Sequence, residues 1–234
     1  MDSGNIGFVL LCAAFVFVMT PGLAMFYGGL VRKKNVVNTM MTSIFIIGIG
    51  IVMWVLFGYS LSFAPSGNAF IGDFRWLGLE GVSLTEGYTD DASIPNMVFS
   101  AFQMMFAVIT PALITGAVAG RMKFKSIFVF TIFWSLIVYY PLAHMVWGQG
   151  GLLGADGIGA LDFAGGDVVH ISSGVSALVL CILLGKRHDY EHSIYRIHNI
   201  PTVVLGASLL MFGWFGFNAG SALAADGLAA HAFM

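Results

Sequence analysis

Six long apolar stretches dominate this 234-residue chain. A helix that crosses the hydrocarbon core of a bilayer needs roughly 20 apolar residues. Each stretch meets that length, so the sequence predicts an all-α polytopic membrane protein with six transmembrane helices. The predicted helices cover Ile6–Leu30, Val36–Phe63, Met97–Ala119, Ile127–Trp147, Val168–Leu184 and Pro201–Ala222.

The composition excludes several other classes of protein. Only 9% of the residues are charged and 58% are hydrophobic, whereas a soluble chain carries about a quarter charged residues. A soluble enzyme and a disordered chain are therefore excluded. The net charge of −2 and the absence of a long basic run argue against nucleic acid as a partner. Cys12 and Cys181 lie in apolar stretches, which argues against a disulfide framework.

The distribution of charge between the stretches predicts the orientation. Nine of the ten basic residues fall in alternate loops, after the first, third and fifth stretches. The intervening loops carry most of the acidic residues, with Arg75 as the basic exception. Basic loops face the cytoplasm in membrane proteins. We therefore expect the N-terminus on the extracellular or periplasmic side, and six spans return the chain to that side.

Motifs of enzymes are missing from the sequence. It contains no Walker loop, no C-x-x-C pair and no Ser-His-Asp arrangement. His188 and His192 have the H-x-x-x-H spacing, but membrane di-iron enzymes need several such boxes and this chain has six histidines in all. We expect a solvated loop there, no metal, no cofactor and no enzymatic activity.

Four ionisable residues lie at or near membrane depth, namely His144, Asp162, Asp167 and His170. Such residues are costly in lipid and are functional hypotheses by default. His170 is either a hydrogen-bonded packing residue or part of a pathway. Asp162 either caps the following helix or stabilises an approaching cation. It precedes His170 by eight residues, near two helical turns, so both could face one side. Asp167 could raise the basicity of His170.

Aromatic residues gather near the centres and ends of the predicted helices. Most such side chains are packing residues or interface anchors. If a small cation must be desolvated, however, their ring faces attract it. The aromatic residues concerned are Phe102, Phe106, Trp147, Trp214, Phe215 and Phe217.

Four segments, in order, resemble motifs of the ammonium transporter family (Amt/Mep/Rh), and specifically its Amt branch. Met19–Arg32, reading MTPGLAMFYGGLVR, is similar to the first-helix signature, and Ala143–Gly148 to the end of the fourth helix. Gly159–His170, reading GALDFAGGDVVH, resembles the most diagnostic motif of the family. Gly213–Ala222, reading GWFGFNAGSA, is similar to the sixth helix.

The resemblance implies roles for individual residues. Phe106, Trp147 and Ser221 would form an ammonium site, with Phe102 in the same vestibule. Phe106 and Phe217 would stack as a pore gate, and His170 would be one of two pore histidines that relay the proton or bind ammonia. Asp162 would support the site electrostatically without touching the ion.

The resemblance also implies an eleven-helix fold of two inverted repeats with a pore between them. Residues 1–234 would then form one transmembrane domain, with the first repeat at about 5–185 and the start of the second at about 200–234. The second pore histidine would lie in the missing half. We therefore expect a fragment that cannot transport ammonium alone. The alternatives are an ammonium sensor with a similar binding domain, or a non-transporting half-protein.

The family further implies a plasma-membrane homotrimer and a cytoplasmic PII-type regulatory partner. Two positions depart from the family pattern. Gly120 stands where a glutamate usually precedes Arg121, which puts the ion pairing of Arg121 in doubt. Asp167 stands at a variable position and either tunes His170 or faces a wet crevice.

Overall fold

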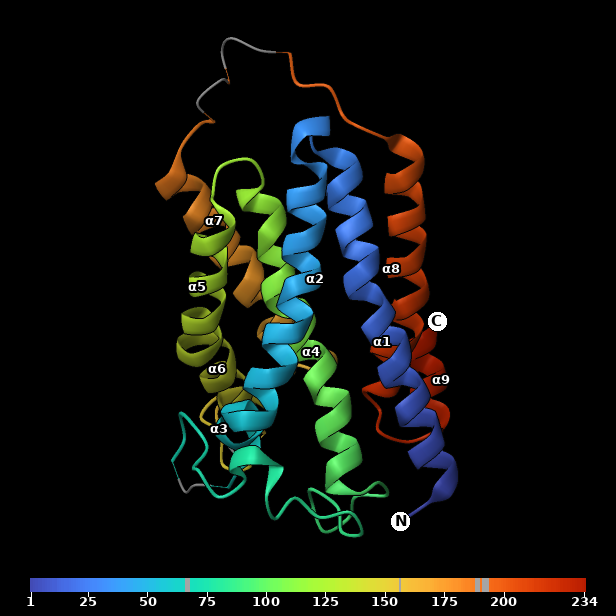
Figure 1. Cartoon of the computed structure of the whole chain (residues 1–234). Coiled ribbons are helices and arrows are strands. Elements are labelled where there is room, and N and C mark those ends of the chain that lie inside the picture. The colour runs from blue at the N-terminus through green and yellow to red at the C-terminus, as the bar shows by residue number, and fades with distance from the viewer. Residues whose placement is uncertain (66–67, 156, 188–189, 191–193) are drawn as a thin grey trace.

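The described part of the chain folds into a bundle of long helices (Figure 1). A computed structural model describes residues 1–65, 68–155, 157–187, 190 and 194–234. Six of its helical segments are long and apolar enough to cross a membrane, which confirms the six predicted spans. They cover Ser3–Leu30, Lys33–Phe63, Asn96–Val118, Phe124–Trp147, Gly166–Leu184 and Ile200–Gly220.

Three of the six spans contain a π-helical turn, and these turns divide them into shorter elements. π-Helical turns are rare in proteins as a whole, and those that do occur are often found at functional sites. They lie at Trp54–Gly58, Ser135–Tyr139 and Gly166–Ile171. The α-helices are α1 Ser3–Leu30, α2 Val36–Met53, α3 Tyr59–Phe63, α4 Asn96–Val118, α5 Phe124–Trp134, α6 Tyr140–Trp147, α7 Ser172–Leu184, α8 Ile200–Gly220 and α9 Gly227–Phe233. Two short 3₁₀ turns cover Lys33–Asn35 and Leu77–Leu79.

Short polar side chains define where several helices begin. Asp2 accepts the Asn5 amide at 2.8 Å at the start of α1. Asn199 accepts the Thr202 amide at 3.0 Å at the start of α8. These bonds satisfy amides that have no partner within the helix, which is why Asp and Asn are favoured at this position.

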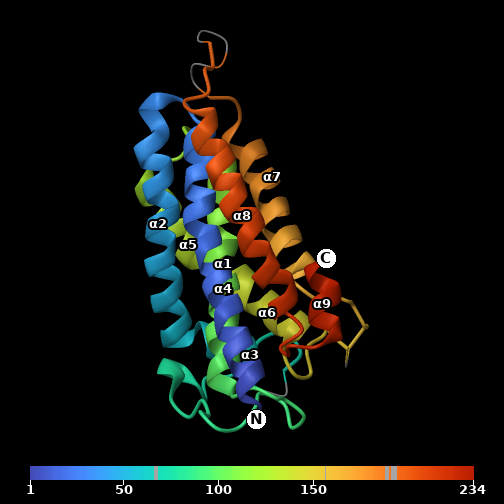
Figure 2. The same cartoon turned by 90° about the vertical axis from the view of Figure 1, so that its right-hand side faces the viewer.

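Helix α4 lies at the centre of the bundle and α8 packs along α1 (Figures 1 and 2). The contact between α1 and α8 requires glycine. A Cβ atom at Gly206 would lie 2.3 Å from the backbone nitrogen of Phe26, and one at Gly22 would lie 2.9 Å from Leu209 Cβ. Small residues permit this close approach of two helices in a membrane protein.

The loops sort by charge to the two ends of the bundle. The described residues after α1, α4 and α7 lie at one end, and the N-terminus and residues 68–95 lie at the other (Figure 1). Eight of the nine basic residues lie in these connections, and Lys125 lies in the first turn of α5. Arg75, the exception, pairs with Asp73 at 2.7 Å. This hydrogen bond holds the pKa of the Asp73 carboxyl below its usual value. The basic residues therefore gather at one end of the bundle, as the predicted orientation requires. Which end faces the cytoplasm stays a prediction.

Candidate functional site

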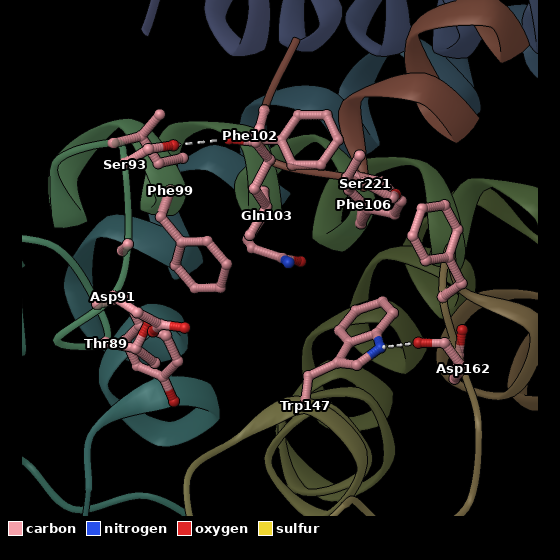
Figure 3. Close-up of a pocket in the computed structure, with 17 residues that line it drawn as sticks. Thr89, Asp91, Ser93, Phe99, Phe102, Gln103, Phe106, Trp147, Asp162 and Ser221 are labelled. Atoms are coloured by element: carbon pink, nitrogen blue, oxygen red, sulfur yellow. Dashed lines mark hydrogen bonds between the residues drawn. The ribbon is translucent and has the colours of Figure 1, made fainter. Parts of the chain in front are cut away.

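A cavity of about 520 Å³ opens where α4, α6 and the C-terminal end of α8 meet (Figure 3). It lies at the end of the bundle that holds residues 64–95. Phe102, Phe106, Trp147 and Ser221 all line it, and we call it the aromatic cavity. The sequence predicts that these four residues contribute to one ligand site. They come from separate parts of the chain and line the same cavity. Their role in binding stays a prediction.

The rings of the aromatic cavity meet edge to face. Phe102 and Phe106 have centroids 4.9 Å apart and planes at 70°. Phe106 and Trp147 have centroids 6.1 Å apart and planes at 83°. The face of an aromatic ring is negative and its edge positive. A cation held against these faces would be attracted electrostatically, and more strongly where water is excluded.

Ser221 offers an acceptor to the aromatic cavity. Its hydroxyl donates to the backbone carbonyl of Phe217 at 2.9 Å. The hydroxyl proton is thereby committed to the helix, and the oxygen lone pairs are left to accept from a ligand. The neighbouring Tyr88 is uncharged at neutral pH, since a phenol ordinarily has a pKa near 10, and burial raises the pKa of this one further, to about 12.

The carboxylate of Asp162 holds the start of the segment that carries His170. Its two oxygens accept the backbone amides of residues 165 to 168 at 2.5 to 2.9 Å. The backbone carbonyl of Asp162 accepts the indole N–H of Trp147 at 2.9 Å. Asp162 thus caps this segment and orients Trp147. Its electrostatic support of a cation stays a prediction.

The idea that Asp162 and His170 share one helical face is wrong. Regular helical structure begins only at Gly166, so helical spacing does not relate the two residues. Asp162 instead lies ahead of the helix as its cap.

Phe106, which lines the aromatic cavity, contacts Phe217 of α8. Their ring centroids are 4.4 Å apart with planes at 47°, and each side chain is 1% exposed. The pair predicted to act as a gate is therefore in direct contact. Its rings are tilted rather than parallel.

A second cavity, of about 400 Å³, lies on the far side of Phe217. We call it the histidine cleft and define it by His170, Leu210, Trp214 and Phe217. The His170 ring lies 5.8 Å from Phe217 and 6.2 Å from Trp214. His170 is exposed, and no hydrogen bond to its ring nitrogens occurs within the described ranges. Whether His170 packs or lines a pathway therefore stays a prediction.

His144 has the packing role instead. It is completely buried, and its ring nitrogens lie 3.1 Å from the carbonyl oxygen of Ser62 and 2.8 Å from that of Asn68. It therefore fastens the loop after α3 to α6. Phe215 also packs, in a stacked contact with Phe233 of α9 at 4.4 Å.

The remaining polar candidates form no second site in the part of the chain that the structure describes. No hydrogen bond or ion pair joins Asp167 to His170 there. Groups of three or more metal-ligating side chains are also absent from those residues. His188 and His192 lie outside the described residues.

The backbone explains the departure at Gly120. Its φ is +70°, a left-handed conformation that side chains disfavour, and a Cβ atom would lie 2.8 Å from Asn35 Nδ2. Arg121 is nevertheless well bonded. Its guanidinium donates to the carbonyl of Gly185 at 2.9 Å, to the carbonyl of Ala117 and to Cys181 Sγ at 2.9 Å. Arg121 therefore needs no carboxylate beside it.

The sequence analysis did not single out Gln103, which also lines the aromatic cavity. Its position could have indicated this, because Gln103 is polar and lies four residues after Phe99 and three before Phe106. At that spacing all three residues share one face of α4.

Comparisons with known proteins identify relatives along the whole chain. The family model described as "Ammonium Transporter Family" matches residues 7–234. An ammonium transporter of Bacillus subtilis (strain 168) is 53% identical, over 100% of this chain and 56% of its own length. One of Aquifex aeolicus (strain VF5) is 45% identical, over 100% of this chain and 54% of its own length.

Solved structures agree with these relatives. Mep2 of Saccharomyces cerevisiae matches with a TM-score of 0.87 at 36% identity, over 100% of this chain and 52% of that one. A structure described as "Sensor Amt Protein" matches with a TM-score of 0.83 at 29% identity, over 97% of this chain and 56% of that one. The chain thus spans about half the length of the relatives it matches.

Proposed function

This chain belongs to the ammonium transporter family, and from that premise we propose that it recruits ammonium in the aromatic cavity and passes ammonia towards His170. The observation that carries the proposal is the contact between Phe106 and Phe217 at 4.4 Å. It joins a cavity suited to a cation directly to an apolar cleft that contains one histidine.

Recruitment would rest on charge and hydrogen bonding together. Ammonium would exchange part of its water shell for the ring faces of Phe106 and Trp147 and for the oxygen of Ser221. A cation–π contact contributes about 0.5 to 2 kcal/mol, more when the site is dry. Potassium has a similar charge and size but donates no hydrogen bond, so it would gain less from Ser221.

Passage would favour the neutral molecule. Beyond the Phe106–Phe217 contact the lining is almost entirely apolar, and an intact ion in such surroundings is strongly disfavoured. Ammonium would therefore transfer its proton to water on the aromatic-cavity side of this contact, and only neutral ammonia would pass it. Ammonia would then hydrogen-bond to a ring nitrogen of His170, which has unused capacity in the histidine cleft.

The complete transporter would need more chain than these 234 residues. His170 lies exposed on the open side of the histidine cleft, and a second half would cover it and supply the second pore histidine. We further propose a multi-pass protein of the plasma membrane with its N-terminus outside. Assembly as a homotrimer and a cytoplasmic PII-type partner belong to the same proposal, which involves no enzymatic step.

A sensor is the second candidate function. The likeness to the structure described as "Sensor Amt Protein" favours it. A sensor would use the same aromatic cavity for binding but would carry no flux. It would require an output domain encoded downstream of the second half, which transporters lack.

A chimera tests the proposed function. Residues 1–234 would be fused to the remaining C-terminal part of the Bacillus subtilis relative, and both this chimera and the 234-residue chain would be placed in proteoliposomes. We expect ammonium-dependent flux from the chimera and none from the 234-residue chain. A chimera that inserts and assembles but carries no flux would contradict transport, and ammonium binding without flux would favour the sensor.

A further inference from the structure

One face of α4 lines the aromatic cavity with Phe99, Phe102, Gln103 and Phe106. Residues separated by three, four and seven positions lie on the same side of a helix, so the four form a single stripe. Gln103 is the one member with a hydrogen-bonding side chain. In Figure 3 its amide projects into the cavity, on the side towards Trp147.

The amide of Gln103 has hydrogen-bonding capacity that the protein does not use. The side chain is 8% exposed. Its Oε1 atom is buried and has no hydrogen-bond partner among the described residues. Buried polar atoms in proteins are nearly always paired, and an unpaired one costs stability because its hydration is lost without replacement. A half-turn of the amide exchanges its oxygen and nitrogen and brings Oε1 to the cavity side, where a ligand with an N–H donor would supply the missing bond.

We propose that Gln103 is a further ammonium-contacting residue, and that its Oε1 accepts one N–H of the ion and sets the preference for ammonium over methylated amines. This inference rests on the proposed function of the aromatic cavity. Ammonium has four N–H bonds in a tetrahedral arrangement. Ser221 takes one, the ring faces of Phe106 and Trp147 attract two, and the Gln103 oxygen receives the fourth.

The consequence is a selectivity that apolar walls alone do not give. Methylammonium has three N–H bonds and one methyl group. When its three donors meet Ser221 and the two rings, its methyl group faces the Gln103 oxygen and leaves that acceptor unpaired. A site that hydrogen-bonds its substrate rejects an analogue lacking the donor more strongly than a hydrophobic pocket rejects an added methyl group.

Two substitutions at Gln103 and one control test this inference. Gln103→Met removes the acceptor at similar length, and Gln103→Asn keeps the amide but shortens its reach. The control is Gln149→Met, because the amide of Gln149 donates to the carbonyl oxygen of Tyr88 at 2.8 Å and that of Gln103 has no such bond. Ammonium and methylammonium would be titrated against each variant, both in the 234-residue chain and in the chimera.

We expect Gln103→Met to weaken ammonium binding about fivefold, the equivalent of one ordinary hydrogen bond, and methylammonium binding less than about twofold. Gln103→Asn should lie between Gln103→Met and the parent, and Gln149→Met should match the parent. Without ligand, Gln103→Met should melt no lower than the parent, since it loses a buried unpaired amide. Unchanged affinities in Gln103→Met, or equal losses for both ions, would overturn the inference.

The same titrations separate this inference from the proposed function. If the parent binds no ammonium, or if Trp147→Leu binds it as tightly as the parent, the proposed function fails. If binding depends on Trp147 but not on Gln103, only the inference about Gln103 is overturned.

Discussion

The aromatic cavity and the histidine cleft lie on opposite sides of the Phe106–Phe217 contact and are built to different degrees. In the aromatic cavity the key groups are already held in place, because Trp147 is bonded to the Asp162 carbonyl at 2.9 Å and Ser221 to the Phe217 carbonyl at 2.9 Å. In the histidine cleft, the ring nitrogens of His170 have no hydrogen-bond partner among the described residues, and the residue lies exposed. On the proposed function, recognition of the ligand would therefore be completed among these residues, whereas the apolar path would need a further wall.

On the proposed function, this difference assigns binding and passage to separate parts of the molecule. The groups around the aromatic cavity come from α4, α6 and α8, which the chain supplies in full. No element among the described residues covers the open side of the histidine cleft. We therefore expect binding and passage to respond separately to mutation.

The largest expected effect joins the two regions. Asp162→Ala removes four amide contacts from the start of the His170 segment and loosens the backbone that holds Trp147. Hydrogen bonds to a charged group contribute about 1.5 to 3 kcal/mol each and are not additive, so we expect a loss of at least about 3 kcal/mol in unfolding free energy. Thermal unfolding in detergent measures it.

The matched control is Asp167→Ala, an acidic residue five positions later whose carboxylate accepts no hydrogen bond within the described ranges. Its loss should remove only a helix-dipole contribution of about 0.3 to 1 kcal/mol. Equal destabilisation by the two substitutions would contradict the capping role of Asp162.

The second prediction separates the two tryptophans. Trp147→Leu should weaken ammonium binding by about tenfold, because it removes one ring face and its cation–π attraction. Trp214→Leu changes the histidine cleft and should leave binding within about twofold of the parent. A titration in nanodiscs measures both. Equal losses would mean that the cavities do not act separately.

The third prediction concerns His170 in the chimera. His170→Ala should lower ammonium flux several-fold, since it removes the imidazole, a side chain of the histidine cleft with a free ring nitrogen that can accept a hydrogen bond. The binding constant in the aromatic cavity should be unchanged. Flux in proteoliposomes and a parallel titration give the two values, and a loss of binding with unchanged flux would reverse the roles we assign.

The smallest expected effect is at Arg75, in the loop beyond both cavities. Arg75 holds the pKa of Asp73 below its ordinary value. The stabilisation it gives is therefore present above the unfolded pKa of about 3.9 and is lost as the pH falls through the lowered value. Because the pair is exposed, Arg75→Ala should barely change the melting temperature at pH 7 and should not alter ammonium binding. A large change in binding would place this loop in the site.

Much of the fold could be predicted from the sequence because lipid imposes simple rules. Span length and the alternation of basic loops were sufficient for the six helices and for the sorting of charge to two ends. The site needed the family resemblance, since nothing in the local pattern distinguishes Phe106 from Phe215, which packs on Phe233 at 4.4 Å.

Other features depend on tertiary contacts that no local pattern encodes. The binding of Asp162 to four amides requires the chain to turn back on itself at Gly165, which adopts a φ of +94°. His144 is a packing residue because a loop 76 positions earlier in the sequence meets its ring. Gln103 was overlooked because a single glutamine in an apolar helix gives no sign that its amide lacks a partner.

Fluorine NMR of the 234-residue chain labelled with 5-fluorotryptophan tests the central claim most directly. The chain has five tryptophans, which single substitutions assign. We predict that ammonium shifts the Trp147 resonance saturably while Trp214 stays in place, and that potassium at equal concentration shifts neither. An equal response to potassium, or a response of Trp214 without Trp147, would contradict the account.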